Sequence, residues 1–498
     1  MKSLKIKSGF FLTIFLIQTG VTMNFALPQQ AELFLVKDGS SKYRIIISRK
    51  ANKIEKKAAS ELKRYIREIS ETRLPVLKDK RKIRECEVIL GKNDHLKKVL
   101  PYMDLETLEE DGFSIITRDK KLIIAGGKGK GLLYGVYTFL EKYLGCRMYS
   151  SSVVKIPEMG NIIIGQINDT QVPLIKFRED YYRDVYDPAF LDWHKLDSHR
   201  DDWGSWVHTF SSLIPPEKYF DEHPEYFSML DGKRVPHTQL CLTDTNVFRI
   251  VVESLQKNIN ENPDANYWSV SQNDTYGFCQ CPECKAIDKK EGSPSGSVIA
   301  FVNQVAVEFP DKTISTLAYQ YSRAAPKSLK PAGNVNIMLC SIECNRSKPI
   351  LTDTLSSLFR KDVEDWGKIT DNIIIWDYVI QFRNLVSPFP NLRVLQPNIR
   401  FFVENNTTAM FQQGNRETGG EFAELRAYLI AKLLWDPYLD IDSVMNDFLS
   451  GYYEEAGSYI RKYIDIMHET LEKSDKKLEI FGSPIDHTDG YLSHDLIV

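Results

Sequence analysis

Residues 267–274, Tyr-Trp-Ser-Val-Ser-Gln-Asn-Asp, decide the fold that we expect for this chain. The apolar start of this stretch predicts a β-strand, which passes directly into the polar run Ser271-Gln272-Asn273-Asp274. Packing alone does not explain such a polar run. Because active sites of barrel enzymes are built at the carboxyl ends of the strands, the stretch predicts a strand that delivers functional side chains.

The same pattern recurs along the chain, with helical segments between several of the strands. Further strands are predicted at Ile175–Phe177, Trp206–Phe210, Gln239–Leu242, Ile314–Tyr319, Val335–Cys340, Ile373–Trp376 and Ala409–Gln412. Helices are predicted at Val247–Ile259, Ser297–Glu308, Leu355–Trp366 and Leu392–Glu404. Eight strands alternating with helices over roughly 260 residues match the order and length of a (β/α)8 barrel. No G-x-G-x-x-G or P-loop follows a strand, which argues against a doubly wound nucleotide-binding fold.

The chain of 498 residues is long enough for about two or three domains. Strand and helix patterns predict a small α+β domain over residues 31–165 and the barrel, as the catalytic domain, over residues 172–420. A C-terminal helical segment is expected at 421–475, with helices Glu421–Leu434 and Ile441–His468, followed by a tail at 476–498.

The N-terminal segment predicts export. Lys2, Lys5 and Lys7 precede an apolar run from Gly9 to Ile17, a pattern typical of a signal peptide, here residues 1–26. The run is too short to span a membrane, so we expect a periplasmic or extracellular protein with no membrane span after cleavage. The alternative is an apolar N-terminal arm of the first domain.

The composition limits the kinds of partner that we expect for this protein. Sixty-four basic and 67 acidic side chains give a net charge of −3, without a basic block, which argues against binding of nucleic acid. Aromatic residues make up 11% of the chain and suit the ring faces of a carbohydrate. The sequence does not indicate an oligomeric state.

Three carboxylates follow predicted barrel strands: Asp274, Glu343 and Asp377. Cleavage of a glycosidic bond needs two carboxyl groups, one to protonate the leaving oxygen and one to act as base or nucleophile. We assign Asp274 as the general acid and Asp377 as the base or nucleophile, with Glu343 as the alternate. We expect them to line the largest cleft of the barrel, about 5 to 9.5 Å apart. The alternative is a structural role, for example an ion pair between Glu343 and Arg346.

Aromatic and polar side chains near the same strand ends are candidates for substrate binding. They are Trp206, His208, Tyr319, Tyr321, Trp376, Tyr378 and Arg178. The stretch from Asp180 to His208 is also rich in aromatic and hydrogen-bonding residues, which suits a sugar, although some of these aromatic residues will belong to the core.

Cys279, Cys281 and Cys284 form a Cys-x-Cys-x-x-Cys cluster five residues after Asp274. Three thiolates are one ligand short of a tetrahedral zinc site, which Cys241, Cys344 or a nearby histidine could complete. A disulfide with a free thiol, or three reduced cysteines, are the alternatives. A structural role is expected because no adjacent histidine would activate a thiol. The expected glycosidase chemistry requires no cofactor.

Several of these segments resemble known families. Residues 129–141 with Leu144-Gly145-Cys146-Arg147 resemble the closing helix of the small domain that precedes the barrel in family 67 alpha-glucuronidases and beta-hexosaminidases. The barrel segment resembles the bacterial domain of unknown function 4838 family. The matching motifs are residues 271–274 with the cysteine loop, 295–296 with 301–303, 316–321, 376–378, and 425–429 with 434–437.

The resemblance implies a barrel with a carbohydrate-related role. Beta-hexosaminidases carry Asp-Glu after the fourth strand, whereas this chain has Asn273-Asp274, so their substrate-assisted mechanism is not carried over. The leading hypothesis is an exported glycoside hydrolase that acts on a polysaccharide or oligosaccharide. The rival hypotheses are a non-catalytic carbohydrate-binding protein that uses the same groove, and a zinc-dependent hydrolase centred on the cysteine loop.

Overall fold

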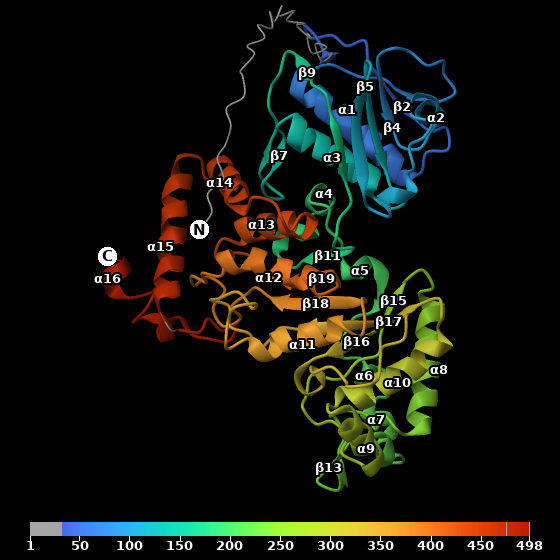
Figure 1. Ribbon diagram of the computed structural model, residues 1–498, viewed down its shortest axis with the longest axis vertical. Helices are drawn as coiled ribbons and strands as arrows, with labels where there is room; N and C mark the ends of the chain where they lie inside the picture. The colour runs from blue at the N-terminus through green and yellow to red at the C-terminus, as the bar shows by residue number, and fades with distance from the viewer. Residues whose placement is uncertain (1–31, 475, 498) are drawn as a thin grey trace, which may run out of the picture.

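The computed structural model describes residues 32–474 and 476–497, which form a small α/β domain next to a larger one (Figure 1). The predicted signal peptide lies outside these residues. Among the residues described, no helix combines the length and the apolar character that crossing a membrane requires.

The small domain is built on a six-stranded mixed sheet of order β10-β5-β6-β4-β2-β3. Its strands are β2 (Arg44–Ile47), β3 (Val76–Lys78), β4 (Glu87–Leu90), β5 (Phe113–Arg118), β6 (Lys121–Gly126) and β10 (Asn168–Gln171). Helices α1 (Lys53–Ser70) and α3 (Gly131–Thr138) pack together against the sheet. Two short pairs, β1 (Leu33–Val36) with β9 (Ile162–Ile164) and β7 (Arg147–Met148) with β8 (Val154–Lys155), complete the domain.

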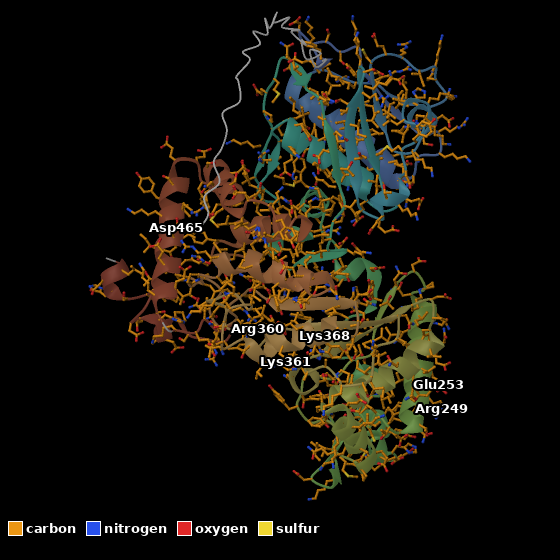
Figure 2. All side chains as sticks on the ribbon, in the orientation of Figure 1. Arg249, Glu253, Arg360, Lys361, Lys368 and Asp465 are labelled. Carbon is orange, nitrogen blue, oxygen red and sulfur yellow. The ribbon has the colours of Figure 1, made fainter. Side chains whose placement is uncertain are left out.

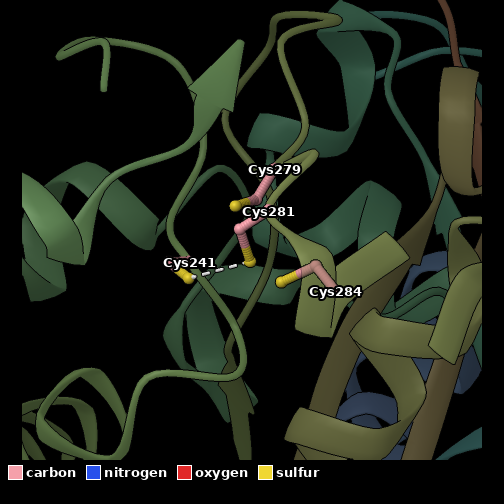
Figure 3. Close-up of side chains that lie close together, drawn as sticks. All are labelled: Cys241, Cys279, Cys281 and Cys284. Atoms are coloured by element: carbon pink, nitrogen blue, oxygen red, sulfur yellow. Dashed lines mark hydrogen bonds between the residues drawn. The ribbon is translucent and has the colours of Figure 1, made fainter. Parts of the chain in front are cut away.

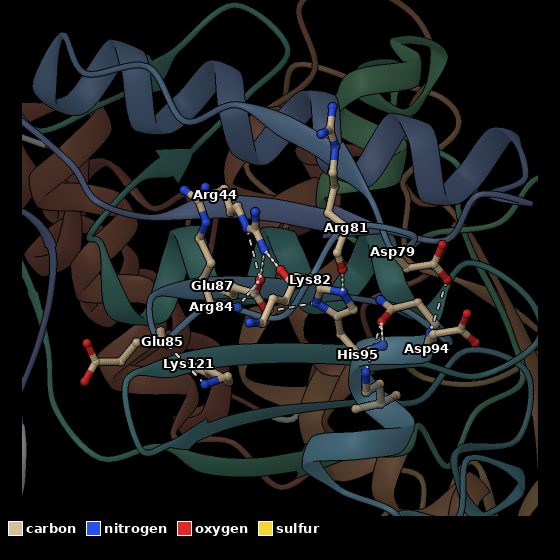
Figure 4. A network of polar contacts seen from close by, with 12 residues as sticks. Arg44, Asp79, Arg81, Lys82, Arg84, Glu85, Glu87, Asp94, His95 and Lys121 are labelled. Carbon is tan, nitrogen blue, oxygen red and sulfur yellow. Dashed lines mark hydrogen bonds and ion pairs between the residues drawn. The ribbon is translucent and has the colours of Figure 1, made fainter.

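A buried polar network stabilises one end of this sheet (Figure 4). Glu87 is fully buried and accepts hydrogen bonds from Arg44 Nε at 3.0 Å and from the His95 ring Nδ1 at 2.9 Å. The other ring nitrogen of His95, Nε2, lies 2.8 Å from the carbonyl oxygen of Arg81. Because a buried charge is tolerated only when it is paired and hydrogen-bonded, this network holds helix α2 (Asp94–Val99) and the loop at 81–84 to the sheet.

The larger domain contains a curled, fully parallel sheet of seven strands in the order β11-β19-β18-β17-β16-β15-β12. These strands are β11 (Phe177–Asp180), β12 (Trp203–Ser205), β15 (Tyr267–Ser269), β16 (Thr313–Ala318), β17 (Val335–Cys340), β18 (Ile373–Tyr378) and β19 (Thr407–Gln413). Between them lie α8 (Thr245–Glu261), α9 (Pro282–Glu291), α10 (Ser295–Glu308), α11 (Ser357–Gly367) and α12 (Leu392–Glu404). The predicted fold class is therefore confirmed, as a half-barrel of parallel strands that alternate with helices.

Two of the predicted strands are not part of this sheet. The predicted strand Trp206–Phe210 is irregular chain that leads into a short helix beginning at Phe210, and the strand at this place is β12, which begins three residues earlier at Trp203. The second lies outside the sheet altogether. The segment Gln239–Leu242 makes only an isolated antiparallel bridge, between Leu240 and Phe227, so β12 pairs directly with β15. It belongs to a lobe over residues 210–294 that also contains α6 (Phe210–Leu213), α7 (Pro216–Tyr219) and the hairpin of β13 (Met229–Leu230) and β14 (Lys233–Arg234).

The pleat of the parallel strands decides which side chains reach the inside of the half-barrel. Leu317, Met338 and Ile374 pack in one cluster inside it, whereas Ile337 and Ile375 belong to the main core shared with the helices. Because side chains alternate between the two faces of a strand, this register fixes the orientation of each residue at the strand ends.

The C-terminal helices bridge the two domains. The predicted helix Ile441–His468 is divided into α14 (Ile441–Tyr452) and α15 (Gly457–Lys473) by a short 3-10 turn, while α13 (Ala423–Trp435) is continuous. Trp435 stacks on Phe113 of the small domain at 5.7 Å between ring centroids, and its indole N–H donates to Gln171 at 2.7 Å. Charged side chains such as Arg249 and Glu253 cover the outer helices (Figure 2).

Short helices occupy the connections. They are α4 (Pro188–Trp193), α5 (His199–Asp202) and, at the end of the described chain, α16 (His494–Ile497). The segment that precedes α16 returns to the mouth of the half-barrel, where Phe382 N–H donates to the Ile480 carbonyl at 2.7 Å and the two rings of Phe382 and Phe481 stack. Ile480 is buried in the interior cluster of the half-barrel, so this segment forms part of its wall.

Candidate active site

A cleft of about 370 Å³ opens at the carboxyl ends of β11, β18 and β19. We call it the aromatic cleft; its lining includes Tyr181, His199, Trp206, Trp376 and Phe411. The rings form a continuous wall, with centroids 5.7 Å apart for Trp206 and Trp376 and 4.6 Å apart for Trp376 and Phe411. Aromatic faces beside a few oriented polar groups suit the binding of a sugar ring.

A buried glutamate orients the histidine of this cleft. Glu179 is 2% exposed and accepts two hydrogen bonds from His199, from the ring Nδ1 at 2.6 Å and from the backbone N–H at 2.8 Å. The His199 ring also stacks on Trp206, with 4.4 Å between ring centroids. Burial raises the pKa of Glu179, and the hydrogen bonds from His199 oppose that rise. Because an ionised carboxylate only accepts, Nδ1 carries a proton and Nε2 is the nitrogen left for a ligand.

Asp274 lies exposed at the same edge of the sheet, beyond the end of β15. Its carboxylate accepts a hydrogen bond from the hydroxyl of Tyr319 at 3.1 Å. The ring of His208 lies 6.1 Å from that of Tyr319, and its Nδ1 is 2.8 Å from the carbonyl oxygen of Gln272. The structure therefore brings Asp274, His208 and Tyr319 together.

The polar run before Asp274 braces the loop that carries it. The Gln272 amide donates to the Tyr319 carbonyl at 2.9 Å. The buried Gln239 side chain accepts from the Asn273 backbone N–H at 2.8 Å and donates to the carbonyls of Asn273 and Thr275 at 2.8 and 2.7 Å. Gln239, in the segment Gln239–Leu242 that was predicted as a strand, therefore binds the backbone on both sides of Asp274.

Glu343 lies just beyond the carboxyl end of β17. It is exposed and forms an ion pair of 2.7 Å with Arg323, which also binds Asp362 of α11 at 2.6 Å. Burial raises the pKa of the Cys340 thiol inside the half-barrel most, and the charges of Glu343 and Asp274 raise it further. Glu343 and Asp274 both follow the carboxyl ends of parallel strands, β17 and β15. The expected partner Arg346 instead binds the carbonyls of Tyr378 and Ser341.

Asp377 faces away from the mouth. It is 3% exposed and accepts a hydrogen bond of 2.6 Å from Ser341, on the outer face of β17. Its neighbours Trp376 and Tyr378 point inward, where Tyr378 packs in the interior cluster. The pleat of β18 therefore directs Asp377 toward the layer between sheet and helices, so the structure does not bring it together with Asp274 and Glu343.

Two of the predicted binding residues also lie elsewhere. The fully buried Arg178 points outward from β11 and pairs with Asp111 of the small domain at 2.6 Å. Tyr321 stacks on Phe278 at 4.8 Å, outside the interior cluster. Trp206, Trp376 and Tyr378 do lie at the mouth. The aromatic cleft itself is lined by none of the three predicted carboxylates.

A larger cavity, of about 570 Å³, lies at the opposite edge of the sheet. Lys176, Asn336, Asp371 and Thr408 line it, and these residues lie at or before the amino ends of their strands. Because barrel enzymes carry their chemistry at the carboxyl ends, we do not assign the active site to this cavity despite its size. None of the three predicted carboxylates lines this cavity or the aromatic cleft, and Asp377 lies apart from the other two.

Sequence reasoning missed Glu179, because the first strand was predicted to end at Phe177. The alternation in Phe177-Arg178-Glu179 is the signal that could have found it, since Glu179 shares the inward face of Phe177.

The structure also contains a candidate metal centre. The predicted Cys279, Cys281 and Cys284 are joined by Cys241, and all four thiols are buried (Figure 3).

Comparison with known proteins agrees with this architecture. The sequence model of the family described as domain of unknown function (DUF4838) matches residues 148–465, and that of the glycosyl hydrolase family 67 N-terminus matches residues 35–139. The predicted family resemblance is thus confirmed for both domains. No curated protein matches the chain.

Solved glycoside hydrolases share the fold. A family GH115 4-O-methyl-alpha-glucuronidase, BtGH115A, with specificity for decorated arabinogalactans, superposes with a TM-score of 0.52 at 10% identity over 89% of this chain. This chain spans only 62% of the length of that protein. A GH20 beta-N-acetylhexosaminidase from Streptomyces coelicolor A3(2) gives a TM-score of 0.46 at 12% identity, covering 86% of this chain and 93% of its own. At 10% identity, the likeness to the GH115 structure shows a glycoside hydrolase-like fold alone.

Proposed function

Because the chain belongs to the DUF4838 family, whose name assigns no activity, we propose from its site that it is a glycoside hydrolase acting on a polysaccharide or oligosaccharide. The observation that carries the proposal is the aromatic cleft with its buried Glu179–His199 pair at the carboxyl edge of a parallel sheet, the same edge at which Asp274 and Glu343 follow β15 and β17. In this proposal the protein acts outside the cytoplasm, as the N-terminal sequence predicts.

The roles follow from the environment of each side chain. Asp274 is the general acid, held by the Tyr319 hydroxyl at the edge of the mouth. Glu343 is the base or nucleophile, because it is exposed at the carboxyl edge of the sheet and its ion pair with Arg323 keeps it ionised. This replaces Asp377 in the proposal, since an outward, buried carboxylate cannot reach a sugar in the mouth. His199 hydrogen-bonds a sugar hydroxyl, and Trp206 and Trp376 stack on the ring.

Leaving-group dependence tests the acid. An activated aryl leaving group needs little protonation, so Asp274→Asn should slow cleavage of an unactivated oligosaccharide by about 10²–10⁴-fold and spare much of the aryl glycoside activity. Glu343→Gln should slow both substrates alike. Glu253→Gln, on the exposed face of α8, is the matched control and should change neither rate. Equal losses on both substrates in Asp274→Asn would exclude Asp274 as the acid.

A non-catalytic carbohydrate-binding protein is the second candidate. The observation in its favour is that the carboxylates do not line the aromatic cleft, so sugar binding and bond cleavage are not forced to coincide. Sugar binding without turnover, unchanged in the Asp274→Asn and Glu343→Gln variants, would favour this function over hydrolysis.

A further inference from the structure

Four buried cysteines from two distant segments meet in the lobe next to the mouth (Figure 3). Cys241 lies in the Gln239–Leu242 segment, Cys279 and Cys281 lie in the loop that leads into α9, and Cys284 lies in the first turn of α9. Their sulfur atoms all lie within 4.8 Å of one another, and the Cys241 and Cys281 sulfurs are 3.7 Å apart. A disulfide requires about 2.05 Å between sulfurs, so these four are thiols gathered around a common point.

The spacing matches a tetrahedral metal site. Zinc–thiolate bonds of about 2.3 Å place the corners of a tetrahedron roughly 3.8 Å apart, close to the distance between Cys241 and Cys281. We propose that these residues bind one structural Zn²⁺ ion, which fixes the loop carrying Asp274; the ligands are Cys241, Cys279, Cys281 and Cys284.

The surroundings suit thiolates. The backbone N–H of Met229 donates to the Cys279 sulfur at 3.4 Å, and the Arg234 guanidinium lies 3.8 Å from the same atom. The Thr243 hydroxyl is 3.3 Å from the Cys284 sulfur. Because four thiolates around one Zn²⁺ carry a net negative charge, a nearby guanidinium and N–H or O–H donors stabilise them. Helix α9 begins directly after Cys281, so its positive N-terminal end adds to the same effect.

Two short chain segments join the proposed zinc site to the mouth of the half-barrel. Cys241 is two residues from Gln239, which binds the backbone on both sides of Asp274, and Cys279 is five residues from Asp274 itself. A fixed cysteine cluster therefore fixes both segments that hold this carboxylate. The zinc assignment is independent of the proposed function, whereas the positioning of Asp274 rests on it.

Metal content tests the assignment without any substrate. Protein produced with zinc supplied should contain about one zinc per chain, because the metal is needed to hold the thiolates together. Cys241→Ser and Cys284→Ser should each lose it. Cys344→Ser, which replaces a buried cysteine outside the cluster, is the matched control and should keep it. Metal-free wild type with four free thiols, or a disulfide from Cys241 to the loop in a peptide map, would overturn the proposal.

A measurement on wild type covers the case in which the serine variants do not fold. Titration with a mercurial thiol reagent, followed with a zinc-sensitive dye, should release zinc as the four cluster cysteines react and not when Cys344 reacts. Zinc release that follows modification of other cysteines contradicts the ligand set.

The positioning role has its own readout. Removal of zinc by a chelator should reproduce the pattern of Asp274→Asn, with cleavage of the unactivated oligosaccharide reduced about tenfold or more and aryl glycoside activity largely kept. An equal loss on both substrates from zinc-free protein contradicts the positioning of Asp274 and leaves the zinc content as the separate test of the metal site.

Discussion

The Glu179→Gln substitution isolates the role of the buried pair in the aromatic cleft. Glutamine keeps the size of Glu179 but has only one accepting oxygen, whereas the carboxylate accepts from both the backbone N–H and the ring Nδ1 of His199, at 2.8 and 2.6 Å. If the amide oxygen keeps the backbone N–H, its NH₂ group faces Nδ1. The ring must then move its proton to Nε2, which points a donor instead of an acceptor at the ligand.

The size of the effect follows from the bonds that change. A hydrogen bond to a charged group contributes about 1.5–3 kcal/mol, which corresponds to a loss of roughly 10- to 150-fold in kcat/KM. Stability should hold, since burial already raises the pKa of Glu179 and glutamine removes the cost of burying its charge. The assay is kcat/KM on an oligosaccharide, with the melting temperature as the check on folding.

Asp180→Asn is the matched control for this experiment. Asp180 is the next residue of β11 and is fully buried, but it lies on the outward face of the strand, so its substitution should leave kcat/KM unchanged. A folded Glu179→Gln variant with kcat/KM within about twofold of wild type would refute the role of the pair, because the loss of a charged hydrogen bond in the cleft predicts at least tenfold.

Two further predictions concern stability. Burial lowers the pKa of His468 to about 4 in the folded state. Below about pH 6.5 the unfolded chain therefore binds a proton at His468 while the folded protein does not. The contribution of His468 to stability is fully present above pH 6.5, and the free energy of unfolding falls by about 3 kcal/mol as the pH is lowered to 4. Urea unfolding should show that His468→Gln removes this part of the acid sensitivity, and an unchanged pH slope would contradict it. Asp111→Asn should lower the free energy of unfolding by about 3 kcal/mol, because the buried Arg178 then keeps a single carboxylate partner, Asp197 at 3.4 Å. A loss no larger than that of Glu253→Gln would show that the Arg178–Asp111 pair is unimportant for stability.

Buried strands made much of the fold predictable from the sequence. Val335–Cys340 was predicted with its observed ends, and β16 within one residue, because both strands are almost entirely buried and are rich in apolar and β-branched residues. Gln239–Leu242 was wrongly predicted as a strand because its buried residues belong to a loop. The Gln239 amide hydrogen-bonds the backbone on both sides of Asp274, and Cys241 belongs to the cysteine cluster. Local sequence does not distinguish such a loop from a short strand.

The site was predicted only in part, for reasons that follow from strand ends. β18 was expected to stop at Trp376, which would have left Asp377 free at the edge; it continues to Tyr378, so the pleat directs Asp377 outward. β11 likewise continues past Phe177, and this places Glu179 inside. The position of Asp274 beyond a strand end was easier to predict, because β15 ends at Ser269 and a polar run follows it. In that run the side-chain amides of Gln272 and Asn273 hydrogen-bond backbone carbonyls.

The most direct test of the central claim is a crystal structure of Asp274→Asn with a bound oligosaccharide. The proposal predicts a sugar ring stacked on Trp206 or Trp376 in the aromatic cleft, with a hydroxyl at His199 Nε2 and the scissile bond between positions 274 and 343. A sugar bound in the cavity at the amino ends of the strands, lined by Lys176 and Asp371, would contradict it.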